Sequence, residues 1–518
     1  MRVNMSCFLG IDAGTSGIKA IVMGEDGVLL GTGSAECGLI TPKPGYAEQN
    51  PLEWWKACND AVAEAVFKSG CGKDVAGIGL SGQMQGCVPV DKAMKPIGNC
   101  LIWLDQRAVR EAEELNAGAD AEELLDIAAM TCLPSFWAPK LLWLKRNEPD
   151  KFEHIHKVLF PKDYLRFCMT GEIATDVSDA SCTLLLDMKA HTWSDRLIER
   201  SGLSRELLPE RVLESCAEAG RLLPEVAKRW GVNAGIPVAA GGGDQTVGGI
   251  GCGVVREGVI SSTIGTSGVV FGCCGTPFTD RQNRAMYSLC HSVPGMYSFL
   301  GVTLGAGGSL KWMRDTFFAE KKKELEKIGG NIYAHMDALA EKAAPGCEGL
   351  VFLPYLNGES TPHNDPSARG VFMGLSYRHD MPSIVRSVLE GVTFSLRDTI
   401  EIMRDLGVEV NEVRAMGGGA KSALWRRLQA DIFNARVITM NMEEGPAAGA
   451  AILAGVASGY FASVEEGCDA VLKPVSAVEP DPKNAALYAE YYESYRSLYP
   501  ALKNTFASQA ALVEKHFE

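Results

Sequence analysis

One carboxylate stands among small, uncharged neighbours in the segment IPVAAGGGDQTVGGIG, residues 236–251. Asp244 follows three glycines, at a point where an apolar strand breaks into a turn and a small-residue helix can begin. Two interpretations fit this pattern. Asp244 could cap the helix by accepting hydrogen bonds from its first free N–H groups. Alternatively, it could serve as a catalytic acid or base. The segment by itself leaves both open.

Two identical turns elsewhere in the chain suggest phosphate binding. Gly-Thr-Ser-Gly begins at Gly14 and again at Gly265, each time between two apolar strands, and the copies lie about half the chain length apart. Backbone N–H groups and hydroxyls in such a turn can hold phosphate oxygens closely. A chance recurrence is the alternative in a chain with 56 glycines. The shared strand context favours duplication, which predicts two related α/β domains around a common cleft.

Residues beside these turns add further chemistry. Asp12 precedes the first turn and offers oxygen ligands suited to Mg²⁺. A third turn, MGGGAKS at 416–422, follows a predicted strand and suits close approach to a nucleoside, although a structural turn explains it nearly as well. Neither a GxxxxGK[ST] motif nor an HRD and DFG set occurs, which disfavours those ATP-binding classes.

Composition narrows the class of protein. A length of 518 residues predicts at least two large domains. The net charge of -14 disfavours a nucleic-acid partner. Sixteen scattered cysteines without a CxxC pair indicate a reduced, cytoplasmic enzyme. The uncharged segment 445–462 is mostly Ala and Gly, so we expect a closely packed buried helix there rather than a membrane span, and no membrane partner.

Alternating strand and helix patterns predict α/β layers. In the first half, three strands within 7–36 form an antiparallel meander, and a capped helix covers 50–70. Further elements are expected as buried strands at 75–82 and 236–243, a strand–turn–strand at 258–274, a helix at 382–407, a strand-to-turn segment at 413–422 and a helix at 423–434.

Longer motifs follow one another in a familiar order: GIDAGTSGIKA, SGQMQG, WLDQR, PKDYLRFCMTGE, SDASCT, AGGGDQ, IGTSGVV, FLPYLNGESTPHNDPSARGVFMGL, LEGVTFSLRD, MGGGAKSALWRRLQADI and EEGPAAGAA. In this order they resemble the FGGY carbohydrate kinases, and among these most closely the xylulokinases. The resemblance runs from about residue 8 to about residue 460. The long FLPYLNGESTPHNDPSARG segment is very specific, whereas the glycine turns alone would not be.

The resemblance implies an actin-like ATPase fold of class α/β, with two ribonuclease-H-like domains flanking a catalytic cleft. We expect the first domain, 1–245, to bind the sugar and the second, 246–518, to bind the nucleotide. The implied activity is ATP-dependent phosphorylation of a ketopentose, in particular D-xylulose to D-xylulose 5-phosphate. ATP, Mg²⁺ and the small-molecule sugar are the expected cofactors and partners. A homodimer is compatible with the resemblance, but the sequence does not determine the oligomeric state.

The resemblance also assigns individual residues. Asp244 matches the family's general base, which favours the catalytic interpretation, and Asp12 is the expected metal ligand. The expected sugar-site residues are Met84, Gln85, Trp103, Asp105, Asp244 and Gln245. The expected nucleotide-site residues are Gly14, Thr15, Thr266, Gly418, Gly419 and Ser422.

Some of these residues have simpler interpretations. Trp103 could be a core aromatic, Asp105 and Arg107 could form a surface pair, and His363 is expected to give structural support. Gln85 replaces the His that is usual in xylulokinases, and Gln245 replaces the usual Asn and is also familiar from glycerol kinases. Another ketose or polyol, such as ribulose or a glycerol-like compound, is therefore an alternative substrate. An actin-like ATPase without a sugar substrate is the weaker alternative.

Overall fold

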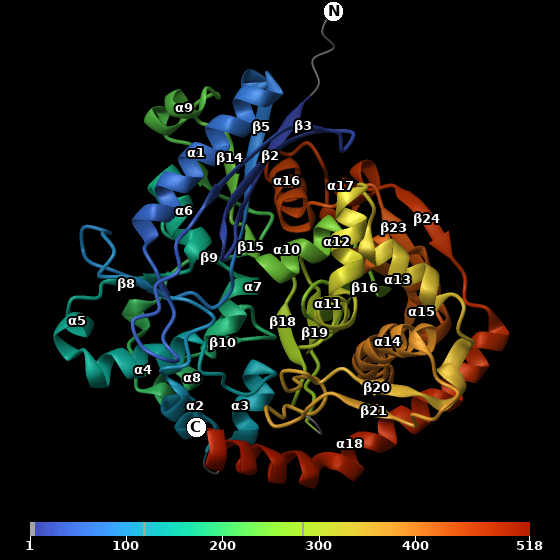
Figure 1. The fold of residues 1–518 in the computed structure, drawn as a ribbon. Coiled ribbons are helices and arrows are strands. Elements are labelled where there is room, and N and C mark those ends of the chain that lie inside the picture. The colour runs from blue at the N-terminus through green and yellow to red at the C-terminus, as the bar shows by residue number, and fades with distance from the viewer. Residues whose placement is uncertain (1–5, 118–120, 282–283, 518) are drawn as a thin grey trace, which may run out of the picture.

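The computed structural model describes residues 6–117, 121–281 and 284–517. Two seven-stranded sheets dominate it, one built from the first half of the chain and one from the second (Figure 1). The first sheet has the order β13 (Glu218–Arg221), β14 (Pro237–Ala239), β5 (Val75–Gly82), β1 (Cys7–Ala13), β2 (Gly17–Gly24) and β3 (Leu29–Glu36), with β15 (Gly242–Gly243) also paired to β5.

The second sheet repeats this pattern. Its order is β18 (Tyr287–Cys290), β19 (Tyr297–Thr303), β17 (Gly268–Cys274), β16 (Gly258–Ile264), β22 (Val410–Gly417), β23 (Arg436–Met440) and β24 (Pro474–Val478). In each sheet an antiparallel meander of three strands is followed by parallel strands, since β1 pairs parallel to β5 as β16 pairs parallel to β22. This shared strand order confirms the predicted α/β class and supports the duplication.

Local sequence signals account for the helices around the sheets. Helix α1 (Pro51–Ser69) begins after Asn50, whose side chain accepts from Leu52 N, and ends at Gly70 in the left-handed conformation with φ 62°. The predicted helices of the second half are α14 (Met381–Asp405) and α15 (Ala423–Phe433), both close to their expected bounds. The chain ends in the long helix α18 (Pro482–Phe517).

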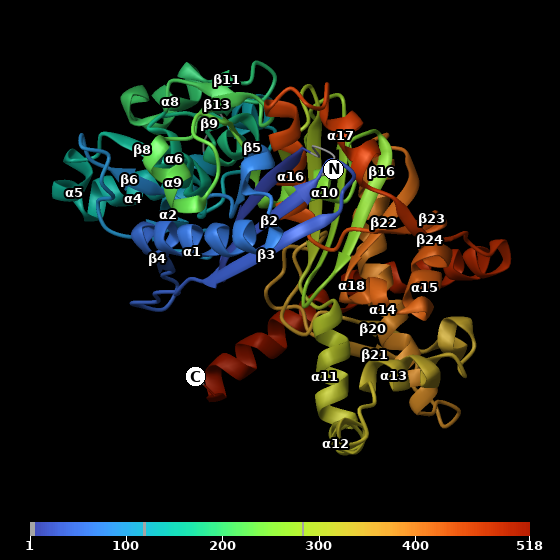
Figure 2. The ribbon, with the colours of Figure 1, turned by 90° about the horizontal axis from the view of Figure 1, so that it is seen from above.

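Helix α16 (Gly445–Ala457) lies between the two halves, beside the strands of the first sheet (Figure 2). It packs on β1 and β5 and on helix α10 (Asp244–Gly251), and its residues are mostly buried. Glycines make this packing possible: a Cβ built at Gly10 would lie 2.0 Å from Ala447 O, and one at Gly79 would lie 1.9 Å from Ala450 O. Segment 445–462 thus contains the buried, closely packed helix that its small residues predict.

Among the described residues, no helix has the length and apolar character needed to cross a membrane. All sixteen cysteines are free thiols, and of the adjacent residues Cys273 and Cys274 the first is buried. The division of the chain between residues 245 and 246 stays a prediction.

Replacing Gly79 by alanine tests the contact between α16 and the first sheet. The added Cβ would overlap a backbone oxygen that cannot rotate away, so we expect Gly79→Ala to lower the free energy of unfolding by about 1–3 kcal/mol. Urea unfolding followed by circular dichroism measures this. Gly38→Ala is the matched control, because its Cβ would have no atom closer than 3.7 Å. Equal stability of the two variants would contradict the described packing.

Candidate active site

The strand register places Asp12, the predicted metal ligand, and Asp244, the predicted base, at the same end of neighbouring strands in the first sheet. Asp12 of β1 lies opposite Ser81 of β5, and Ser81 lies opposite Gly242 of β15. Strand β15 leads directly into α10, whose first residue is Asp244. Both carboxylates are half-buried, and the negative charge of Asp12 acts on Asp244. The chain therefore brings together two acids that lie far apart in sequence.

The structure excludes one of the two local interpretations of Asp244. Gly243 is the N-cap of α10, and Asp244 is the first residue within the helix, so the capping interpretation is wrong. Gln245 Nε2 donates to Asp244 Oδ1 at 3.5 Å, a long contact. Burial, together with the neighbouring Asp12, raises the pKa of Asp244 to about 7. A carboxylate with this pKa is suited to accept a proton near neutral pH.

Asp12 has the character expected of a metal ligand. Burial raises its pKa to about 6, although the positive charge of Lys19 opposes this effect. Its Oδ1 is buried and has no hydrogen-bond partner among the residues that the structure describes. Lys19 forms an ion pair of 2.5 Å with Glu444, immediately before α16. An unpartnered buried carboxylate oxygen fits Mg²⁺, which commonly takes one or two protein carboxylates, waters and substrate phosphates.

Trp103 connects the predicted sugar site with the first phosphate turn. Its Nε1 donates to Thr15 Oγ1 at 2.9 Å, and 44% of the side chain is exposed, so the core-aromatic interpretation is wrong. Behind the turn, Gln49 donates to Thr15 O at 2.8 Å, and Gln83 donates to Gln49 Oε1 at 2.7 Å. The turn carrying Gly14 and Thr15 is thus held by two amide side chains that the sequence analysis did not identify.

Met84 and Gln85 lie next to the Asp244 segment. A Cβ built at Gly243 would lie 2.6 Å from Met84 Cγ, so glycine is needed there for the Met84 side chain to fit. Gln85 is half-buried and has φ 67°, a left-handed conformation that few residues with a side chain adopt. Gln245 is exposed beside Asp244. The loop that carries Met84 and Gln85 thus packs against the segment that leads into Asp244.

Asp105 stabilises its own loop through hydrogen bonds of a buried carboxylate. Its carboxylate is fully buried and accepts from Ala47 N at 2.7 Å and from the Arg107 side chain at 2.8 Å, while Arg107 also pairs with Glu48 at 2.6 Å. The Arg107 guanidinium stacks on Tyr46, 4.0 Å from the ring centre. The pair of Asp105 and Arg107 therefore exists, but it is buried rather than on the surface. The place of Asp105 in the sugar site stays a prediction.

A cavity of about 420 Å³ lies at the second phosphate turn. This volume is typical of a small-molecule site. It contains the four residues predicted for the nucleotide site in the second half: Thr266, Gly418, Gly419 and Ser422. The sequence analysis missed other residues that line it, among them Gly307, Gly308, Lys311, Asn331, Tyr333, Asp337 and Trp425.

Backbone contacts shape this cavity. Helix α11 (Gly307–Phe317) begins against the turn, with Gly307 N donating to Gly265 O at 2.8 Å and Gly308 N donating to Thr266 O at 2.9 Å. Ser422 caps α15 by accepting from Trp425 N at 3.0 Å. Two helices thus begin at the cavity, and helix N-termini favour anionic groups.

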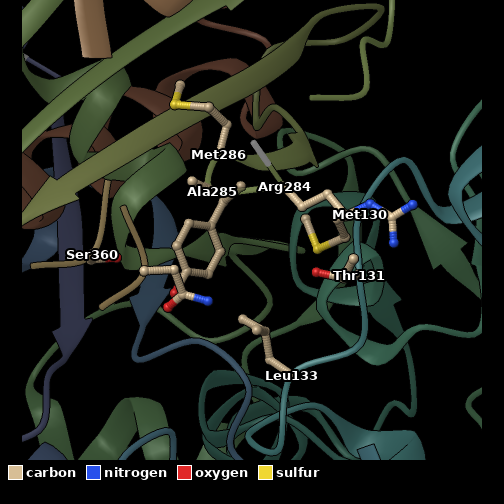
Figure 3. A pocket seen from close by; sticks show the side chains of 9 residues that line it. Met130, Thr131, Leu133, Arg284, Ala285, Met286 and Ser360 are labelled. Carbon is tan, nitrogen blue, oxygen red and sulfur yellow. The ribbon is translucent and has the colours of Figure 1, made fainter. Parts of the chain in front are cut away.

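A second cavity lies between the two halves but is much smaller, about 50 Å³ (Figure 3). Met130, Thr131 and Leu133 line it from the first half, and Arg284 and Met286 line it from the second. This space suits a few water molecules rather than a nucleotide. His363 is next in sequence to Asn364, which also lines this cavity. The His363 ring itself packs on Tyr499, with the ring centres 3.5 Å apart.

Family comparisons agree with this geometry. The sequence model of the FGGY family of carbohydrate kinases, N-terminal domain, matches residues 7–251, and that of the C-terminal domain matches residues 260–458. The chain belongs to the FGGY family of carbohydrate kinases. This FGGY kinase is therefore an enzyme that phosphorylates a carbohydrate with ATP, as the sequence analysis predicted.

Individual relatives cover nearly the whole length of this FGGY kinase. It is 38% identical to a xylulose kinase of Bacillus subtilis (strain 168), over 96% of this chain and 98% of the relative. The xylulose kinase of Escherichia coli (strain K12) is 37% identical over 96% and 99%. The crystal structure of a xylulose kinase from Brucella ovis has a TM-score of 0.87 and 35% identity, covering 96% of this chain and all of that chain. This likeness confirms the predicted actin-like ATPase fold.

Replacing Asp244 tests its role as the base. Asp244→Asn keeps the size of the side chain but cannot accept a proton, so we expect turnover to fall by about 10²–10⁴-fold. ATP affinity should stay unchanged, because the nucleotide cavity lies on the other half. Coupled ADP release and calorimetric titration with ATP measure the two quantities.

Asp195→Asn provides a matched control, because Asp195 is also the first residue of a helix, α8 (Asp195–Ser201), and is exposed. Turnover near the wild-type value in the Asp244 variant would rule out the assigned role.

The raised pKa of Asp244 also predicts a pH dependence. As the pH falls through about 7, the carboxylate becomes protonated and can no longer accept a proton, so kcat/KM for the sugar should fall. Steady-state kinetics between about pH 5 and pH 9 measure this acidic limb. A profile that stays flat down to about pH 5, with the protein still folded by fluorescence, would exclude Asp244 as a base with this pKa.

Proposed function

We propose that this FGGY kinase transfers the γ-phosphoryl group of ATP to a ketopentose, with D-xylulose as the substrate and D-xylulose 5-phosphate as the product. The observation that carries the proposal is the pair of carboxylates Asp12 and Asp244 at the same end of the central strands. Asp244 does not serve as a helix cap, and its pKa is raised to about 7. The substrate follows from relatives named xylulose kinase, which are 37–38% identical over almost the full length.

The proposed reaction is an in-line displacement. A sugar hydroxyl attacks the γ-phosphorus, Asp244 accepts the hydroxyl proton, and ADP leaves as the bond to the γ-phosphoryl group breaks. Phosphoryl transfer depends mainly on positioning and on stabilising charge. The two Gly-Thr-Ser-Gly turns would hold phosphate oxygens through N–H groups and hydroxyls. Gly418, Gly419 and Ser422 would contact the nucleoside in the 420 Å³ cavity.

Mg²⁺ is the proposed metal, and Asp12 is the residue that would hold it, since its buried Oδ1 lacks a partner among the described residues. When bound with ATP, the ion would neutralise phosphate charge. Met84, Gln85, Trp103, Asp105 and Gln245 remain the proposed sugar-site residues. For Asp105 the proposal is an indirect role, because its carboxylate is buried and paired.

Another ketose or a polyol is the second candidate for the substrate. Gln85 and Gln245 depart from the usual xylulokinase residues. Gln245 directly follows Asp244, and Gln85 follows Met84, which packs against Gly243. A polar pocket discriminates strongly between hydroxyl patterns, because unmatched polar groups are left unpaired. An ADP-coupled panel of ketopentoses, hexuloses and polyols tests the proposal. We expect the highest kcat/KM for D-xylulose, and the absence of ADP release with any sugar or polyol would contradict a kinase function.

Gln85→His tests the sugar contact of this residue. Histidine tolerates the left-handed backbone at position 85 better than most side chains do, so the loop should keep its shape. The ratio of kcat/KM between two sugars should change by an amount equivalent to about 1–3 kcal/mol for one altered pocket hydrogen bond. KM for ATP should remain the same. Unchanged ratios for every sugar in the panel would place Gln85 outside the pocket.

A further inference from the structure

A buried lysine lies beneath the two loops that carry the proposed sugar-site residues. Lys140 belongs to helix α4 (Trp137–Asn147) and is completely buried. Its Nζ donates to three backbone oxygens: Gln85 O at 2.9 Å, Leu101 O at 3.0 Å and Ile102 O at 2.9 Å. An ammonium group has three N–H donors, so all of them are used. The acceptors come from two loops that are distant in sequence.

Lys140 differs from the other fully buried lysine of this region. Lys162 is surrounded by carboxylates, with Asp163, Asp176 and Asp179 at 2.7, 2.8 and 3.2 Å. Lys140 forms no ion pair within the part of the chain that the structure describes, and its three direct partners are carbonyl oxygens. Burying a charge without a counter-ion costs several kcal/mol, which packing alone does not require.

The same helix holds the next carbonyl of the first loop. Trp137, one turn earlier in α4, donates from Nε1 to Gly86 O at 2.8 Å, and its ring stacks on Phe160 with centres 4.0 Å apart. Two donors of one rigid helix therefore fix two consecutive peptide groups after Gln85. These hydrogen bonds act next to Gln85, whose left-handed backbone conformation, with φ 67°, is unfavourable for a residue with a side chain.

The second loop contacts the first phosphate turn. Ile102 O, which Lys140 binds, belongs to the peptide that precedes Trp103, and Trp103 donates to Thr15 Oγ1 at 2.9 Å. Because peptide groups are planar, fixing this carbonyl also fixes the direction in which the Trp103 backbone starts. The backbone bridge between Cys87 and Leu101 joins the two loops further along, and the Lys140 ammonium ties together their ends at Gln85 and Ile102.

We propose that Lys140 is a positioning residue, which fixes the Gln85 and Trp103 loops relative to each other and so determines affinity for the sugar without touching it. The proposal rests on the sugar site of the proposed function. It assigns Lys140 no direct role in phosphoryl transfer, so its effect should appear in KM for the sugar rather than in ATP binding.

Protonation of Lys140 supplies a test that packing alone would not pass. Burial lowers its pKa from 10.5 to about 8; the charged or titratable groups around it are Cys87, Cys100, Asp105 and Arg107. Above about pH 8 the neutral amine has two N–H donors for three carbonyl oxygens. The loops should then loosen, and KM for the sugar should rise.

Deprotonation of Lys140 should weaken sugar binding but should not destabilise the folded protein. Between about pH 8 and 10.5 the unfolded state binds more protons at this lysine than the folded state does. Its contribution to the free energy of unfolding therefore rises over this range. A rise in KM for the sugar above pH 8 would thus not reflect unfolding driven by Lys140.

The experiment compares Lys140→Met with Lys145→Met. Lys145 lies on the same helix but is exposed and donates only to Gly202 O, at 3.0 Å. We expect Lys140→Met to raise KM for D-xylulose by about tenfold or more, with KM for ATP within about twofold of wild type. The rise in KM between about pH 7 and 9.5 should occur in the wild type and in Lys145→Met but be absent from Lys140→Met.

Further variants separate failure of this inference from failure of the proposed sugar site. Gln85→Ala should raise KM for the sugar if the site is placed correctly. A raised KM in Gln85→Ala with an unchanged KM in Lys140→Met would overturn the role of Lys140. Unchanged KM in both would overturn the sugar site and, with it, this inference.

If Lys140→Met does not fold, Trp137→Phe removes the donor to Gly86 while keeping an aromatic ring on Phe160, and it should raise KM for the sugar. The pH dependence of KM for the sugar can also be measured on the wild-type enzyme, so this test does not depend on a variant that folds. A KM for the sugar that stays constant from about pH 7 to 9.5 would exclude the role proposed for the Lys140 ammonium.

Discussion

The close backbone packing of helix α16 is the constraint on which the catalytic site depends. This helix touches strand β1 at Gly10, where a Cβ would lie 2.0 Å from one of its carbonyl oxygens. It also touches helix α10 at Gly251, where a Cβ would lie 1.8 Å from another. Strand β1 carries Asp12, and α10 begins with Asp244. Since backbone meets backbone at both contacts, flexible side chains do not set the distance between the two acids.

Bringing two carboxylates into one partly buried site has an electrostatic consequence. Burial raises the pKa values of Asp12 and Asp244 to about 6 and 7, and the negative charge of Asp12 adds to the rise at Asp244. A carboxylate near neutrality can both accept and release a proton at physiological pH. The same arrangement leaves a concentration of negative charge that a divalent cation would offset. A metal bound at Asp12 would thus also act electrostatically on Asp244.

Much of the fold was predictable from sequence, because its signals are local. Asn50 and Gly70 mark the ends of α1, and the two Gly-Thr-Ser-Gly turns join antiparallel strands as expected. Site residues within glycine-rich motifs were also found, including the nucleotide-site glycines that line the 420 Å³ cavity. Their types indicate chemistry without knowledge of their neighbours. The capping interpretation of Asp244 was a local inference too, and it was wrong because Gly243 occupies the cap.

Other features could not be predicted, because they depend on contacts between distant segments. Lys140 stands in WAPKLLWLKRN, which reads as an ordinary amphipathic helix, and only the fold brings three carbonyl oxygens to its ammonium. Asp105 and Arg107 looked like a surface pair because no local pattern places Tyr46 over the guanidinium. Asn331 and Asp337 reach the large cavity from a segment that has no motif.

The two copies of the Gly-Thr-Ser-Gly turn show how a duplicated unit can acquire different roles. Two residues before the first turn stands Asp12, and at the equivalent place before the second stands Thr263. In the neighbouring parallel strands these residues face Ser81 and Met416, respectively. The first copy therefore carries the carboxylate that we propose as the metal ligand. The second has no carboxylate at this position, and its neighbouring strand leads instead into Gly418 and Gly419 beside the large cavity. A carboxylate before the first turn suits the metal that is proposed to accompany the phosphates, and one such ligand suffices for Mg²⁺, so the second copy can hold phosphate oxygens through its N–H groups and hydroxyls without an acid of its own.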